Sequence, residues 1–253
     1  MTAVIARTIE SIDRSALMTI DPSRTVADLA VSLPHATRIF ARFGIDFCCG
    51  GKRPLSDACA RVGASLDEVV RSLETESREG GPSGPELAKK PLGELVRHVL
   101  DHHHVFTREE LGRLGALAQK VATVHGGGHA HLATLRDLVR DLDEDLRPHM
   151  MKEEHILYPY VLALAGGARP QSPFGEVSRP IGVMNAEHES TGEILRKIRE
   201  CAGGFDVPSE ACGSWRALYE GLRALESDLF EHIHLETNVI FPRAIETEKA
   251  LRA

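Results

Sequence analysis

The chain has 253 residues, of which 42% are hydrophobic and 5% aromatic, so it can bury one substantial core and leave room for a small second unit. Its formal charge of −7 is spread over mixed-sign helices without a clustered basic stripe, so we expect no nucleic-acid partner. Residues 1–15 lack a signal-peptide core, and the best apolar run, near residues 160–165, is too short to cross a bilayer. We therefore expect a soluble cytoplasmic protein with no membrane partner.

Helix-forming residues recur at helical spacing in nearly every segment, and strand signals are weak, so the sequence predicts an all-α protein. Residues 1–22 are expected to be a flexible extension, to which we assign no function. Over residues 23–75, short amphipathic stretches separated by Pro34 and Gly44 predict a small helical domain. Residues 76–90 are rich in glycine, serine and proline, which predicts a linker.

Four long helical patterns fill residues 91–248. Their predicted bounds are about 91–124, 131–165, 180–202 and 208–247. Pro91, Pro180 and Pro208 stand near helix starts, where a missing N–H costs nothing, and glycine runs follow the first three patterns. Four helices joined by fairly short connections predict an antiparallel four-helix bundle of the up-and-down kind.

Two of these helices carry a histidine and a glutamate four residues apart: His149 with Glu153, and His232 with Glu236. Residues at this spacing lie on one face of a helix, so each pair presents an imidazole and a carboxylate together. Taken singly, each pair is explained about as well by an exposed His–Glu interaction. Both pairs, however, are followed by an apolar segment and a proline. This duplication at matched depth favours a shared metal site.

Histidines on the other two helices can complete such a site. His188 fits, and so does one histidine of the run 102–104, although periodicity alone does not separate His103 from His104. Two glutamates that can bridge and four terminal histidines make a mixed nitrogen and oxygen set suited to two iron or manganese ions, with zinc as a contaminant.

Other polar residues of the bundle have weaker assignments. Asp145 and Glu187 could orient a ligand or line a proton path, although such residues are more often simply solvated. The remaining histidines of the bundle are predicted to be surface residues: His98, His102, His125, His129, His131, His155 and His234.

The five cysteines have neither the even count nor the spacing of a disulfide framework, so we expect reduced thiols. Cys48 and Cys49 are adjacent, and a bond between them would be strained. They are candidates for a thiol role toward metal, nitrosyl or a partner. The equally weighted alternative is that they are small buried hydrophobes beside a Gly-Gly turn.

Three segments together resemble the Repair of Iron Centres family of di-iron proteins. They are Asp-Phe-Cys-Cys-Gly-Gly-Lys at 46–52, His-Met-Met-Lys-Glu-Glu at 149–154, and Leu-Glu-Thr-Asn-Val-Ile-Phe-Pro-Arg at 235–243. The resemblance spans about residues 25–245 and implies a hemerythrin-like bundle behind a small domain with the double cysteine. It also implies an oxo- and carboxylate-bridged di-iron centre. The matching positions, which take His104 rather than His103, are His104, His149, Glu153, His188, His232 and Glu236.

The family relation implies repair of iron–sulfur clusters damaged by nitrosative or oxidative stress, through donation of labile iron. Damaged iron–sulfur proteins would be the partners, and nitric oxide, oxygen or peroxide the small ligands. Two alternatives stay open: nitric oxide reduction at the di-iron centre, and a gas-binding sensor or carrier, so whether the protein is an enzyme is open too. The set has fewer histidines than an oxygen-carrying hemerythrin, which argues against oxygen storage. A homodimer is one candidate assembly.

Overall fold

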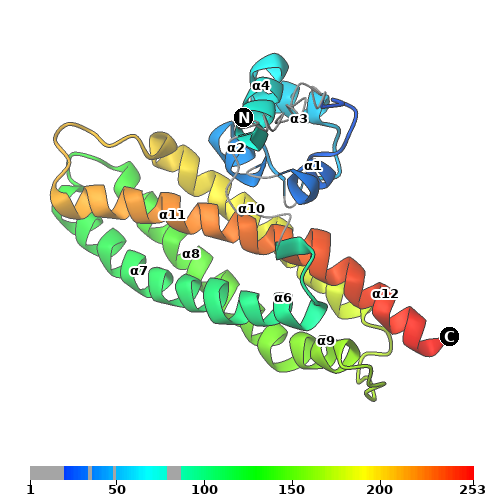
Figure 1. The fold of residues 1–253 in the computed structure, drawn as a ribbon. Helices are drawn as coiled ribbons and strands as arrows, with labels where there is room; N and C mark the ends of the chain where they lie inside the picture. Colours follow the sequence, from blue (N-terminus) through cyan, green and yellow to red (C-terminus); the bar gives the residue numbers. More distant parts are fainter. Residues whose placement is uncertain (1–19, 34–35, 48–49, 79–86) are drawn as a thin grey trace, which may run out of the picture.

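The computed structural model describes residues 20–33, 36–47, 50–78 and 87–253. The predicted thiol pair, Cys48 and Cys49, lies outside these ranges, as does most of the predicted N-terminal extension. Every regular element in the described ranges is helical, which confirms the all-α prediction. Figure 1 shows a group of short helices seated on a bundle of long ones.

The small domain is built from short amphipathic helices. Its described helices are α1 (Val26–Ser32), α2 (Ala36–Arg42), α3 (Leu55–Val62) and α4 (Leu66–Arg78). The hydroxyl of Thr25 caps α1 by accepting the backbone N–H of Asp28 at 3.2 Å. Leu29, Phe40 and Leu55 are fully buried among the helices, so this unit has an apolar core of its own.

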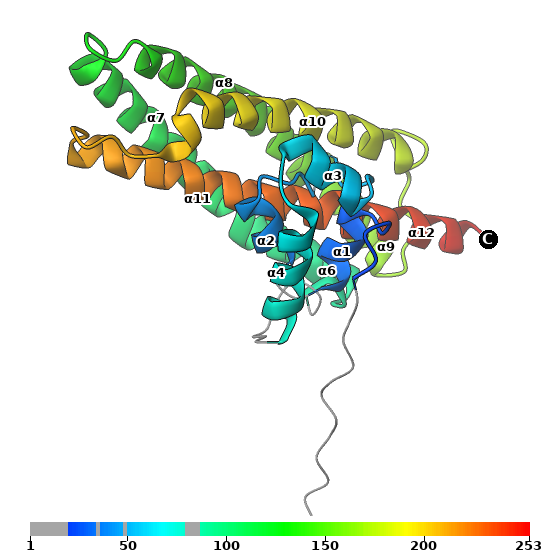
Figure 2. The ribbon, with the colours of Figure 1, turned by 90° about the horizontal axis from the view of Figure 1, so that it is seen from above.

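The small domain rests on the bundle through aromatic contacts. Phe230 of the bundle packs against the small domain's core, and its ring lies 5.9 Å from that of Phe47. Next to this contact, the side-chain amide of Asn238 donates to the backbone carbonyl of Phe47 at 3.3 Å. Figure 2 shows the short helices lying across α10 and α11. The segment just before the double cysteine is therefore held against a long helix.

Each of the bundle's four long helices consists of one to three consecutive helical segments. The first comprises α6 (Leu92–His98), η1 (Val99–His104) and α7 (Val105–His125); the second α8 (His131–Lys152), η2 (Glu153–Leu157) and α9 (Tyr158–Ala165); the third α10 (Ser178–Cys201); and the fourth α11 (Gly213–Leu235), η4 (Glu236–Ile240) and α12 (Phe241–Arg252). A 3₁₀ turn, η3 (Gly203–Phe205), follows the third. α7 packs on α8 and α11, and α8 packs on α10. None of the described helices combines the length and apolar character needed to cross a membrane.

The predicted start of the fourth helix at Pro208 is wrong. The backbone N–H of Ala211 closes a turn onto the Pro208 carbonyl, and Cys212 is extended with φ −73° and ψ 170°, so the helix begins at Gly213. A proline favours the first position of a turn as much as the first position of a helix, and the sequence pattern does not separate the two.

Two apolar clusters divide the bundle along its length. One, which we call the distal cluster, joins the C-terminal part of α7, α8, the C-terminal part of α10 and the N-terminal part of α11. The other joins α6, α9, the N-terminal part of α10 and α12. On each long helix, the predicted ligands stand between the residues of these two clusters, so the fold sets aside a polar layer inside an apolar core.

Three of the four long helices widen into a π-helical turn at this layer. η1 ends at His104, η2 begins at Glu153 and η4 begins at Glu236. Such single π turns within α-helices occur mostly at functional sites, where they re-aim side chains. The helix geometry therefore changes where the candidate ligands are.

Candidate metal centre

The structure brings all six predicted ligands into one buried layer. None of them exposes more than 2% of its surface: His104, His149, Glu153, His188, His232 and Glu236. Their donor atoms form two overlapping groups that could each hold a cation. The first group contains His104 and His232, the second contains His149 and His188, and both glutamates belong to both groups.

Each glutamate lies between one histidine of each group. Glu153 Oε2 is 3.3 Å from His104 Nε2 and 3.4 Å from His149 Nε2. Glu236 Oε2 is 3.0 Å from His188 Nε2, and its Oε1 is 2.9 Å from His232 Nε2. Both carboxylates are therefore placed to bridge two cations, with one imidazole pair on either side.

The donor atoms of the layer fit cations better than they fit one another. His104 Nε2 and both carboxylate oxygens of Glu153 complete no hydrogen bond with any described residue. Buried polar atoms normally have a partner, because leaving one unsatisfied is costly. Imidazole nitrogens with carboxylate oxygens form a set that suits iron, manganese or zinc. The residues present thus fit a dinuclear metal centre.

The pKa values of the layer reflect burial and the short distances between its ionisable groups. Burial and the neighbouring Glu236 carboxylate raise the pKa of Glu153 well above its usual range. Burial alone would raise the pKa of Glu236 as well, but His232 and the hydrogen bonds to the carboxylate lower it well below the usual range. Burial, with a smaller effect of a neighbouring histidine, lowers the pKa of His104 and His149 to about 4. The imidazoles of His104 and His149 are thus kept neutral, as metal ligands must be.

Carboxylates outside the layer hold two of the histidines from behind. His104 Nδ1 lies 2.7 Å from Glu154 Oε1, and His149 Nδ1 lies 2.9 Å from Glu187 Oε2. Arg108 pairs with Glu154, and Lys152 pairs with Glu187. Such outer partners fix the tautomer and ring orientation of a ligand. Glu187 thus orients a candidate ligand, although that ligand is His149 rather than its sequence neighbour.

Asp145 does not contact a candidate ligand in this way. Its Oδ2 accepts the hydroxyl of Thr191 at 2.7 Å, a contact between α8 and α10. The sequence analysis missed Glu154 as an outer partner. The available signal was its position directly after Glu153, but adjacent helical residues point in different directions and only the packed bundle shows which neighbour each one meets.

His103 is buried but belongs to a different contact. Its Nδ1 is 3.0 Å from Asp228 Oδ1, and its ring stacks on His232 with centroids 5.4 Å apart and planes 11° apart. Helical periodicity could not separate His103 from His104 because both side chains are buried. The structure thus gives His103 a place beside a ligand, not in the ligand layer.

The prediction that His234 is a surface residue is wrong. It exposes 5% of its surface, and its Nδ1 accepts the side-chain amide of Asn238 at 2.9 Å. Its ring packs edge-on against Phe47, with centroids 5.6 Å apart. Two residues along a helix from His232, the side chain points away from the ligand layer, and there the small domain covers it.

Three of the other predicted surface histidines surround Trp215 at the far end of the bundle and are half-buried. Ring centroids of His125, His129 and His131 lie 5.3, 4.8 and 6.0 Å from that of Trp215. His125 Nε2 is also 3.2 Å from the sulfur of Cys212. These residues belong to neither candidate cation group. They form a polar end to the bundle, separate from the centre.

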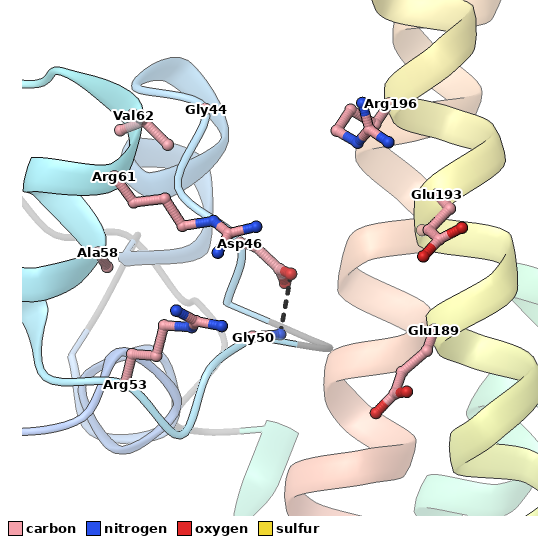
Figure 3. Close-up of a pocket in the computed structure, with 11 residues that line it drawn as sticks. Gly44, Asp46, Gly50, Arg53, Ala58, Arg61, Val62, Glu189, Glu193 and Arg196 are labelled. Atoms are coloured by element: carbon pink, nitrogen blue, oxygen red, sulfur yellow. Dashed lines mark hydrogen bonds between the residues drawn. The ribbon is translucent and has the colours of Figure 1, made fainter.

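A hollow of about 670 Å³ lies between the small domain and α10 (Figure 3). Arg53 and Arg61 reach into it from the small domain, and Glu189 and Glu193 face them from α10. The side chains of these four residues form no ion pair with any residue in the described ranges. Asp46 also lines the small-domain wall and Arg196 also lines the α10 wall, so the net attraction between the two walls is small, and solvent screening weakens it further.

Comparison with known proteins places these observations in a family. Residues 95–244 match the family described as hemerythrin HHE cation binding domain, and residues 22–77 match a domain of unknown function, DUF542. Proteins named iron-sulfur cluster repair protein YtfE from Escherichia coli O1:K1 and Escherichia fergusonii are 36% identical over 223 residues, covering 88% of this chain and 97% of each relative. The protein of the same name from Cronobacter sakazakii is 36% identical over 224 residues with the same coverage. The chain therefore belongs to the YtfE family of hemerythrin-type proteins, as the sequence resemblance implied.

Proposed function

We propose that this chain is a di-iron protein that repairs damaged iron–sulfur clusters in the cytoplasm by donating iron. The observation that carries the proposal is the buried layer in which two glutamates each lie between two histidines. The names of the relatives, which specify iron-sulfur cluster repair, support the same function. Damaged iron–sulfur proteins are the proposed clients.

In this proposal, Glu153 and Glu236 would bridge two irons, with the four histidines as terminal ligands. His104 and His232 would hold one iron, and His149 and His188 would hold the other. When bound, such a centre offers open positions for nitric oxide, oxygen or peroxide and can change its oxidation state. The outer carboxylates Glu154 and Glu187 hold their histidines with Nε2 directed inward.

The ligand chemistry favours donation over permanent storage. Carboxylates and imidazoles bind ferrous iron less tightly than thiolates do, and protons compete for both. An unassembled cluster site rich in cysteine is therefore a better acceptor than this centre. The double cysteine, Cys48 and Cys49, remains a candidate relay or docking element, a role predicted from the sequence alone.

The test is iron loading followed by transfer. After anaerobic loading with ferrous iron, we expect two irons per chain, and we expect them to pass to a metal-free cluster protein supplied with sulfide and thiol. Glu153→Gln should lower the iron content sharply, because a neutral amide is a poor bridging ligand. Glu144→Gln is a matched control, since Glu144 is an exposed glutamate of the same helix.

Iron retention separates this proposal from its alternatives. A nitric oxide reductase would turn over without losing metal, and a gas sensor or carrier would bind gas reversibly and neither turn over nor lose metal. Binding of zinc alone, or failure to bind ferrous iron, would refute the di-iron assignment. Iron that stays bound in the presence of the acceptor would refute donation.

A further inference from the structure

The two halves of the centre are alike in most respects. They differ in the Tyr158 hydroxyl, which donates to Glu236 Oε1 on the side of His232, in the approach of His188 Nε2 to His149 Nε2 at 3.2 Å, and at one ring nitrogen that faces away from the layer. We call the pair His104 and His232 the first half-site and the pair His149 and His188 the second half-site. The inference below rests on the proposed function, because it concerns which half-site releases iron. In each half-site, one histidine is backed by a half-buried carboxylate, and that carboxylate is paired with a cation near the surface.

The remaining histidines, His188 and His232, also match in burial and stacking. Both expose no more than 2% of their surface. The ring of His188 lies parallel to Phe241, with centroids 5.9 Å and planes 3° apart. The ring of His232 lies nearly parallel to His103, with centroids 5.4 Å and planes 11° apart. Stacking therefore holds both ring planes similarly.

His188 and His232 differ in the hydrogen bonding of Nδ1, the ring nitrogen that faces away from the layer. His188 Nδ1 lies 3.2 Å from the hydroxyl oxygen of Thr237, and that hydroxyl donates to Asn185 Oδ1 at 3.3 Å. Because the Thr237 hydroxyl gives its only proton to Asn185, its oxygen must accept a proton from His188 Nδ1. His188 therefore carries its proton on Nδ1, and Nε2 is free to bind a metal. His232 Nδ1 is buried and has no hydrogen-bond partner among the described residues. Hydrogen bonds at Nδ1 therefore fix the tautomer with an unprotonated Nε2 for three of the four histidines, and His232 is the exception.

An outer hydrogen bond raises the basicity of a ligating histidine and fixes its orientation, and its loss weakens metal binding by ~10- to 100-fold. We propose that the first half-site holds iron less tightly than the second and is the half-site from which this protein gives iron up. His232 is the weak ligand of that half-site. Thr237 and Asn185 are positioning residues that keep the second half-site filled.

The test follows iron leaving the loaded full-length protein into an excess of a coloured ferrous chelator. We expect two phases of equal amplitude, one fast and one slow. Thr237→Val removes the hydroxyl and keeps the side-chain shape, so it should speed the slow phase by ~10- to 100-fold and leave the fast phase unchanged. Thr107→Val is the matched control, since Thr107 is buried near the same layer and its hydroxyl has no described partner.

Two further variants guard against misfolding and assign the phases. Glu187→Gln weakens the partner of His149 and should also speed the slow phase. Glu154→Gln weakens the partner of His104 and should speed only the fast phase. A Thr237→Val effect confined to the fast phase, or a single phase for both irons in the unaltered protein, would overturn the inference while leaving iron donation intact. Failure to load iron at all would instead refute the proposed function on which the inference rests.

Discussion

The ligand layer and the distal cluster of the same bundle are stabilised in different ways. In the distal cluster, leucines such as Leu142 and Leu222 are buried against other apolar side chains and need no partner. In the ligand layer, Glu153 and His104 are equally buried but leave donor atoms without hydrogen bonds. Folding therefore depends on the apolar clusters, which hold the layer in place at a cost in stability that a bound cation can offset.

The proposed iron donation requires that metal leave without unfolding the bundle, and this difference would allow it. The two apolar clusters flank the layer on every long helix, so the positions of the ligands do not depend on the metal alone. A zinc finger behaves oppositely, because its metal supplies most of its folding free energy. A donor protein needs ligands that remain assembled after donation, and this architecture supplies them.

The largest effect on iron content should come from replacing a carboxylate that is proposed to bridge the irons. Glu153→Met should abolish iron binding and, in the metal-free protein, raise the free energy of unfolding by about 1–4 kcal/mol, because an apolar side chain replaces a buried, poorly paired carboxyl group. Metal analysis and urea unfolding of the metal-free variant measure the two effects. A loss of metal-free stability would break the comparison, since it would mean that the layer stabilises the fold without metal.

Truncating a side chain of the distal cluster should lower the stability of the fold and leave the iron content unchanged, the opposite of the Glu153→Met result. Leu142→Ala should lower the free energy of unfolding by about 2–5 kcal/mol, from lost burial and the cavity left behind. The iron content of the folded protein should not change, because Leu142 lies in the distal cluster and contributes no ligand. Loss of iron from a variant that is still folded would show that the two regions are not independent.

The polar far end should show a pH-dependent thiol and no metal. Backbone N–H groups of the helix start, first that of Trp215, and then His125 lower the pKa of Cys212 to about 7. Burial raises the pKa of Cys201. As pH rises through about 7, the thiolate fraction of Cys212 increases, so at neutral pH it should be alkylated roughly tenfold faster than Cys201.

Mass spectrometry of iodoacetamide adducts, cysteine by cysteine, measures these rates. His125→Ala should move the midpoint for Cys212 to higher pH and leave Cys201 unchanged. Equal rates for the two thiols in the unaltered protein would contradict the environment that the structure gives Cys212.

The smallest effect should come from the charged hollow beside α10. Reversing one wall with Arg53→Glu and Arg61→Glu places it opposite Glu189 and Glu193, so docking of the small domain should weaken by no more than about 1 kcal/mol. Hydrogen exchange at Phe47 should rise slightly, and added salt should cancel the effect. An effect that salt does not reduce would mean that these arginines act through packing. Arg140→Glu, on an exposed face of α8, is the control.

The candidate site could be predicted from the sequence further than its surroundings could. The spacing of His149 to Glu153 and of His232 to Glu236 reflects local helix geometry, which a sequence records directly. The contacts of Glu154, His234 and Thr237 depend on which segment packs on the other side of a helix. Such contacts are tertiary, and no spacing rule encodes them. The choice of His104 over His103 came from the family resemblance for the same reason.

The widened turns at the ligand layer also change how the sequences of three of the long helices should be read. Along the second helix, buried residues recur three or four positions apart through Leu142, Leu146, His149 and Glu153. The next buried residue of this stripe is Leu157, whereas Ile156 is 50% exposed. The π turn at Glu153–Leu157 accommodates one residue more than an α-helical turn would.

A π turn also occupies Glu236–Ile240 on the fourth helix, and the buried positions after it include Phe241 and Ala244. Each π turn amounts to a single-residue insertion at the level of the ligands. An alignment with a hemerythrin-type bundle that lacks these turns should therefore contain one-residue gaps at the ligands themselves. Deleting one such residue would rotate everything beyond it by about 100° about the helix axis and turn one apolar cluster toward solvent.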